Sequence, residues 1–347
     1  MAKTILSIFW NGEQRRPRAF WRLGLQESVW FALQVASAMP VVIIAMVAFS
    51  IPPLEIARYI TESEPFRLVL AAISLVVTLI AVWPAGRFLD RRKFTDFGLH
   101  LHWNWWIDFC FGLALGAVLM GLIFLVEWAA GWASPAGFLQ PYPTGLPFIP
   151  GILSSLIAYV CVGIYEELQS RGYHLKNLAE GLGFIKPKGA VIVATLISSV
   201  IFGVMHAGNP NASAVSTFNL FLAGLFLALG YILTGELSIP IGLHIAWNFF
   251  QGNVFGFPVS GTEAGATFIA IKQGGNDLIT GGAFGPEGGL IGVAAMVLGG
   301  ILTILWVRVH YGRVAILEKL VTPNLRHRGK EATDEEQQAT STENLAA

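Results

Sequence analysis

The chain has 347 residues, of which 54% are hydrophobic and only 13% charged, and its mean hydropathy is +0.61. This composition is far too apolar for an ordinary soluble domain and predicts a protein embedded in a bilayer. The net charge of zero is uninformative as a sum, and no nucleic-acid footprint follows from it, so the partners we expect are the lipid bilayer and a peptide or membrane-protein substrate, and no nucleic acid.

Eight segments are long and apolar enough to cross a membrane as helices, since a crossing needs about 17–25 mostly apolar residues. In chain order they are Val29–Ile51, Phe66–Trp83, Ile107–Trp128, Ile149–Leu168, Ala190–Met205, Phe218–Leu233, Ile239–Phe255 and Leu290–Val309. The sequence therefore predicts an all-α, polytopic membrane protein with about eight transmembrane helices.

The distribution of basic residues predicts the orientation of these helices. The first 28 residues are basic and lack the long apolar run and cleavage site of a signal peptide. If the first span leaves the cytoplasm, all but three of the 22 Lys and Arg residues fall on the cytoplasmic side, the exceptions being Arg58, Arg67 and Lys272. We therefore expect an integral protein of a bacterial plasma membrane with both termini in the cytoplasm, although a protein of the endoplasmic reticulum would have the same pattern.

Composition divides the chain into six expected regions. They are a basic cytoplasmic segment (1–28), three transmembrane helices (29–145), a core that holds the charged motifs (146–255), a Gly-rich loop (256–289), a last transmembrane helix (290–310) and a cytoplasmic tail (311–347). The loop is expected on the non-cytoplasmic side, where it either covers a cavity or is mobile. The tail is polar, charged and poor in aromatic residues, which predicts that it is largely disordered.

Two adjacent glutamates in the fourth span, within GIYEELQSRGY, are the first candidates for chemistry. Charge at membrane depth is costly and usually marks a paired or functional group. Glu167 and Arg171 are four residues apart, so they share a helix face in the better order for an ion pair. Glu166 points about 100° away and is the carboxylate available to a neighbouring helix.

Two further motifs supply histidine and asparagine. FGVMH ends the fifth span with Phe202 and His206, and HIAWN places His244 and Asn248 on one helix face. Glu166 and His206 offer two proton carriers around one water, and a His–Asn pair offers donors for an oxyanion. These are the parts needed to hydrolyse an amide without a covalent intermediate. His244 fits least well, because it lies one turn into its span unless that helix starts earlier or dips.

The motifs EExxxR, FxxxH and HxxxN, in this order on an eight-helix protein, resemble the CAAX prenyl protease 2 and bacteriocin-processing (CPBP, or Abi) family of intramembrane proteases. The resemblance covers roughly residues 146–255. One local departure is EELQSRG, with Gln169 and Ser170 where many members have apolar residues.

The resemblance implies a role for each motif residue. Glu166 with His206 would activate water, and His244 with Asn248 would stabilise the oxyanion. Glu167, Arg171 and Phe202 would hold the site in shape.

The cofactor is left between two alternatives. The family is commonly called metalloproteases, and zinc held by Glu166, His206 and His244 would leave an open position for water. We favour a site without a metal, because the sequence has no i, i+4 pair of histidines here and an Asn donor is less necessary beside a metal.

We therefore expect an intramembrane endopeptidase that cuts membrane-associated or lipidated peptides or proteins. The alternative is a non-catalytic membrane scaffold, or a transporter, that uses the same polar residues as a structural network. A transporter would favour paired repeats with broken helices, and the sequence has neither.

Overall fold

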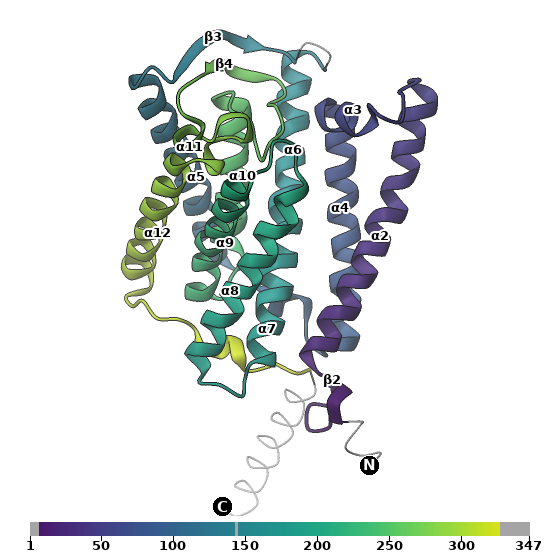
Figure 1. Ribbon diagram of the computed structural model, residues 1–347. Helices are drawn as coiled ribbons and strands as arrows, with labels where there is room; N and C mark the ends of the chain where they lie inside the picture. The colour runs from purple at the N-terminus through teal and green to yellow at the C-terminus, as the bar shows by residue number, and fades with distance from the viewer. Residues whose placement is uncertain (1–6, 143–144, 327–347) are drawn as a thin grey trace, which may run out of the picture.

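The computed structural model describes residues 7–142 and 145–326, and within them it is a helical bundle capped at one end by a small sheet (Figure 1). The helices are α2 (Ala19–Ala48), α3 (Ile56–Glu62), α4 (Glu64–Pro84), α5 (Trp103–Ala129), α6 (Phe148–Glu167), α7 (Lys176–Gly181), α8 (Pro187–Met205), α9 (Ala214–Thr234), α10 (Ser238–Phe249), α11 (Asp277–Thr280) and α12 (Leu290–Tyr311). The strands are β1 (Trp10–Asn11), β2 (Arg16–Pro17), β3 (Ala133–Gln140) and β4 (Thr267–Gln273). The predicted disorder of the tail concerns mainly residues 327–347, which lie outside the described residues. The prediction of an all-α polytopic membrane protein is confirmed.

Seven helices of the described part are long and apolar enough to cross a membrane. The seventh predicted span, Ile239–Phe255, corresponds to α10, which has 12 residues and continues as a π-helical turn to Val254. Its length of ~18 Å is well short of a hydrocarbon layer of about 30 Å. Every residue from Ser238 to Asn248 is buried. The helix can be short because protein, and not lipid, surrounds it.

Glycines let α5 and α10 approach closely enough to hold α10 at the centre of the bundle. A methyl group on Gly112 of α5 would collide with the carbonyl oxygen of Ile239, and one on Gly242 of α10 would collide with that of Phe109. The two backbones are therefore in contact along this seam.

The first transmembrane helix begins ten residues earlier than the sequence predicts, at Ala19. Polar residues in its first turns hid this start, because Arg22 and Gln26 are buried and hydrogen-bonded to the helix of the fourth span. Hydropathy treats such residues as exposed, whereas here other protein groups satisfy them.

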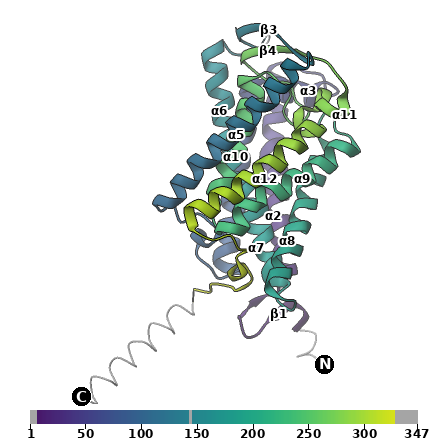
Figure 2. The ribbon, with the colours of Figure 1, turned by 90° about the vertical axis from the view of Figure 1, so that its left-hand side faces the viewer.

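A two-stranded cap, whose strand pairing the sequence did not predict, covers the end of the bundle remote from β1 and β2 (Figure 2). In it, β3 pairs antiparallel with β4, so that Ala133 lies opposite Gln273. The buried carboxylate of Glu64, at the start of α4, accepts hydrogen bonds from the backbone N–H groups of Leu146 (3.0 Å) and Ala266 (2.5 Å). The Gly-rich segment is thereby fixed over the bundle.

Candidate active site

A single helical stretch of 34 residues, from Phe148 to Gly181, carries both adjacent glutamates. It consists of α6, a π-helical segment (Leu168–Leu175) and α7. The side chain of Glu167 is fully buried, and its Oε1 lies 2.8 Å from Nη1 of Arg171 and 2.8 Å from Nδ1 of His244. One carboxylate oxygen therefore joins the helix of the fourth span to α10.

Arg171 and Phe202 form the packed support beneath this contact. The guanidinium of Arg171 lies 4.5 Å from the centre of the Phe202 ring, and its Nη2 donates to the carbonyl oxygen of Gly224 at 3.0 Å. The ring of Phe202 is in turn 4.6 Å from that of His206. The spacing FxxxH thus places an aromatic ring between the buried ion pair and the second histidine.

The two histidines present the same nitrogen to Glu166. Nδ1 of His206 donates to the carbonyl oxygen of Phe202 at 2.7 Å, as Nδ1 of His244 does to Glu167, which leaves both Nε2 atoms facing the site. These Nε2 atoms lie 3.8 Å (His206) and 3.9 Å (His244) from Oε2 of Glu166. The distances are too long for direct hydrogen bonds and leave room for a bridging water.

Oε2 of Glu166 is buried and has no hydrogen-bond partner among the described residues, while Oε1 accepts from the hydroxyl of Tyr165 at 3.2 Å. A buried carboxylate oxygen without a partner is rare and needs an explanation. Its position opposite two imidazole nitrogens identifies the place where a water or a substrate group fits.

The side chains of all four residues predicted to take part in catalysis line one cavity of about 740 Å³. Glu166, His206, His244 and Asn248 line it together, so the three motifs meet as the sequence predicts. The structure places Asn248 one turn beyond His244 on α10, at the cavity wall.

The depth of α10 explains why His244 reaches the site. A methyl group on Gly172 would lie 3.3 Å from the side chain of Leu237, so α10 begins level with Gly172, nine residues before the long helix ends at Gly181. A methyl group on Gly163 would lie 2.6 Å from the side chain of Ile245. His244 is therefore level with the glutamates although it lies near the start of its own helix.

The donor set fits a metal in kind but not in spacing. Histidines whose Nδ1 is held by an oxygen and whose Nε2 faces a carboxylate are typical metal ligands. Zinc requires its ligands at about 2.0–2.2 Å from the ion. Within the described ranges, no group of three or more His, Cys, Asp or Glu side chains is gathered closely enough to hold one.

A second polar cluster, which the sequence reasoning missed, lies at the wall of the same cavity. Oε2 of Glu27 on α2 is 2.8 Å from Nε2 of His174 and accepts from the amide of Gln169 at 2.7 Å, and Gln169 also pairs with Gln26. The available signal was Gln169 itself, a polar residue where the resembling family has an apolar one. Its partners on α2 are distant in sequence and could not be identified.

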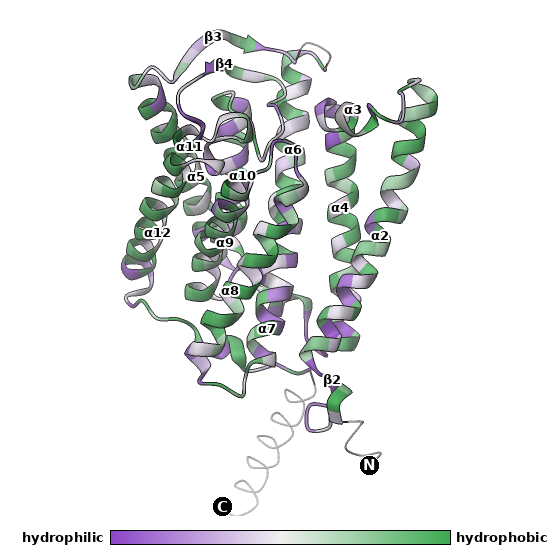
Figure 3. Ribbon diagram, viewed as in Figure 1, coloured by the Kyte–Doolittle hydropathy of each residue, from purple (hydrophilic) through white to green (hydrophobic). Residues whose placement is uncertain are grey.

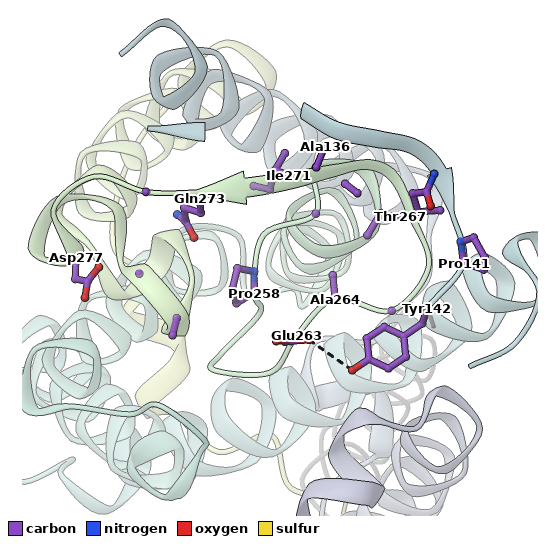
Figure 4. A pocket seen from close by; sticks show the side chains of 17 residues that line it. Ala136, Pro141, Tyr142, Pro258, Glu263, Ala264, Thr267, Ile271, Gln273 and Asp277 are labelled. Atoms are coloured by element: carbon purple, nitrogen blue, oxygen red, sulfur yellow. Dashed lines mark hydrogen bonds between the residues drawn. The ribbon is translucent and has the colours of Figure 1, made fainter. Parts of the chain in front are cut away.

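A larger cavity of about 800 Å³ lies in the cap and is lined by residues such as Tyr142, Glu263 and Gln273 (Figure 4). None of the motif residues lines it. Size alone would therefore have pointed away from the polar constellation.

Comparison with known proteins agrees with the geometry. Residues 148–250 match the family model described as type II CAAX prenyl endopeptidase Rce1-like. No curated protein and no solved structure matches the chain. The matched segment begins with α6 and ends just after α10, so it contains Glu166, Glu167, Arg171, Phe202, His206, His244 and Asn248. Residues 148–250 of the chain thus form a segment that matches the Rce1-like family of type II CAAX prenyl endopeptidases.

Proposed function

We propose that this protein is an intramembrane endopeptidase that hydrolyses peptide bonds of membrane-associated or lipidated substrates with a water activated by Glu166 and His206. The observation that carries the proposal is the unpartnered Oε2 of Glu166, which faces the Nε2 atoms of both histidines in one cavity. The family match supports a protease in general terms.

The first step needs a base and an aligned water. Glu166 takes a proton from the water while Nε2 of His206, whose Nδ1 is held by the Phe202 carbonyl, accepts the second hydrogen bond and aims the water oxygen. The oxygen then bonds to the carbonyl carbon of the substrate, and the carbonyl electrons move to its oxygen.

The second step needs stabilisation of that oxyanion. Glu166, Glu167 and Arg171 together carry a net charge of −1, which one proton on His244 neutralises. An imidazolium at His244 donates through Nδ1 to Glu167 and through Nε2 to the oxyanion, with Asn248 as the second donor. The proton held by Glu166 passes to the leaving nitrogen as the C–N bond breaks, which restores the carboxylate.

The test is cleavage of a quenched peptide library by the purified protein, with products mapped by mass spectrometry. The wild type should cleave, and so should the control Glu318→Gln, whose exposed ion pair with Lys188 is remote from the cavity. His206→Gln should not cleave. A wild type that melts cooperatively but cleaves nothing would favour the non-catalytic scaffold.

A further inference from the structure

The depth of the site within the bundle bears on which substrates can reach it. His206 follows directly after the last residue of α8. That helix begins beside Lys186 and Lys188 and has 19 residues, a length of ~28 Å that nearly equals the hydrocarbon thickness of about 30 Å. His206 therefore lies close to the membrane boundary opposite these lysines.

Two other helices have an end at the same level as His206. The segment 206–213 joins α8 to the start of α9, and the side chain of Asn219 on α9 donates to the carbonyl oxygen of Gly289, just before α12. These helices have 21 and 22 residues, so each also crosses about one hydrocarbon layer. The level of His206 is thus a boundary for three spans.

Two layers of polar contacts, buried except for the side chain of Glu27, close the opposite end of the cavity. The first layer is the cluster of Gln26, Glu27, Gln169 and His174. Side-chain amides of Gln26 and Gln169 bond to each other at 3.0 and 3.2 Å, and both residues are at most 3% exposed.

The second layer is an ion-pair cluster nearer to the termini. Glu180 on α7 accepts from Arg92 at 2.6 Å and from Arg16 at 2.9 Å, while Arg22 lies 2.6 Å from Asp90. All five side chains are at most 2% exposed. Opening this end would separate buried charges from their partners, which is strongly unfavourable.

The wall at the boundary side consists of irregular segments instead. Residues that line the cavity there include Asn209 and Pro210, after α8, and Ser260 and Thr262, in the loop beneath the cap. The amide of Asn209 donates to the carbonyl oxygen of Ser260 at 3.0 Å. Separating a neutral hydrogen-bonded pair of this kind costs much less than separating the buried ion pairs.

Basic residues identify the closed end as the cytoplasmic one. Contacts join several basic segments there. The side chain of Arg91 donates to the carbonyl oxygen of Arg15, and the backbone N–H of Arg326 donates to the carbonyl oxygen of Arg91. Lys188 forms an ion pair with Glu318. Hydrophilic residues gather at this end around α7 and β2 (Figure 3). An excess of Lys and Arg marks the cytoplasmic face.

We infer that the site acts on peptide bonds at the non-cytoplasmic boundary of the membrane, in the outer juxtamembrane segment of an anchored polypeptide and not in a cytoplasmic lipidated tail. The inference rests on the proposed function for the cleavage itself. The side of the membrane from which the site is reached is a separate property. It is inferred from the two layers of polar contacts at the cytoplasmic end and from the level of His206.

Sealed vesicles of both orientations test the cleavage side with a charged quenched peptide library that cannot cross the bilayer. Right-side-out vesicles should cleave it, and inside-out vesicles should show no cleavage above a Glu166→Gln background. Cleavage by inside-out vesicles, alone or equally, would overturn the inference while leaving the proposed function intact. Failure of detergent-solubilised protein to cleave would instead count against the proposed function.

Thiol labelling tests the side without requiring activity. In a Cys110→Ala, Cys161→Ala background, Ser260→Cys should react with a membrane-impermeant maleimide in intact cells. The exposed control Asn324→Cys, at the end where the ion pairs lie, should react only after permeabilisation. The reverse pattern of labelling would contradict the inference whatever the protein cleaves.

Discussion

Nδ1 of His244 lies 2.8 Å from Oε1 of Glu167, a residue 77 positions away in the sequence. The same oxygen accepts a hydrogen bond from Nη1 of Arg171. Glu167 therefore does more than neutralise the arginine on its own helix. It fixes the tautomer and the direction of the histidine on α10, so that Nε2 faces the cavity.

Glu167→Gln should therefore lower both stability and activity. The amide keeps the shape but removes the charge that pairs with Arg171, which would leave a buried guanidinium uncompensated at a cost of about 3–5 kcal/mol. The peptide-cleavage rate should fall because His244 loses its orienting carboxylate. Thermal unfolding and cleavage are measured beside Glu318→Gln, which should match the wild type; an unaffected melting temperature would contradict the structural role.

The hydrogen bonds between Gln26 and Gln169 predict a coupled pair of substitutions. Gln169→Leu should destabilise the protein by about 1–3 kcal/mol, because it leaves the amide of Gln26 buried without a partner. Adding Gln26→Leu should recover part of that loss, since replacing both partners by apolar groups is nearly neutral. Melting temperatures of the two single variants and the double variant measure the coupling, and strictly additive losses would show that the two amides do not depend on each other.

Glu287 predicts a pH dependence of the cap. Burial raises the pKa of its carboxyl from 4.5 to about 7, despite hydrogen bonds from the backbone N–H of Ser260 and from Gln251. Because the folded-state pKa exceeds the unfolded one, the folded state binds the proton more tightly. Stabilisation by this group is full below about pH 4.5 and is lost as the pH rises through about 7, a change of about 3 kcal/mol.

The difference in melting temperature between wild type and Glu287→Gln isolates this effect from other titrating groups. The amide cannot ionise, so the wild type should lose stability relative to the variant between about pH 5 and pH 8. Parallel curves for the two proteins over this range would refute the assignment to Glu287.

Much of the site followed from helical spacing, and the rest required tertiary contacts. The step of about 100° between adjacent helical residues predicted different roles for Glu166 and Glu167. In the structure Glu167 forms an ion pair with Arg171, and Glu166 faces the histidines. The bond from His244 to Glu167 was not predictable, because nothing local shows that α10 starts deep in the bundle. Glu64 and Glu287 were missed for a related reason: each binds a segment without periodicity, whose position only the folded chain defines.

Asn248→Ala should slow cleavage by about 10²–10³, the effect of removing one oxyanion donor in other hydrolases. Exhaustive chelation should leave the wild-type rate unchanged. The purified protein should contain well under one zinc per chain, and neither Asn248→Ala nor chelation should change that content. If zinc were stoichiometric, lost with activity on chelation and restored with it, Glu166, His206 and His244 would be ligands and Asn248→Ala should matter less.

The most direct measurement of the central claim, that Glu166 activates the water, is kcat/KM for peptide cleavage by Glu166→Gln. The amide preserves size and the hydrogen bond from Tyr165 but cannot take a proton. The account predicts the wild-type melting temperature together with a loss of at least about 10²–10⁴ in rate, the contribution of a positioned general base. A correctly folded Glu166→Gln protein that cleaves within a few-fold of the wild-type rate would contradict it.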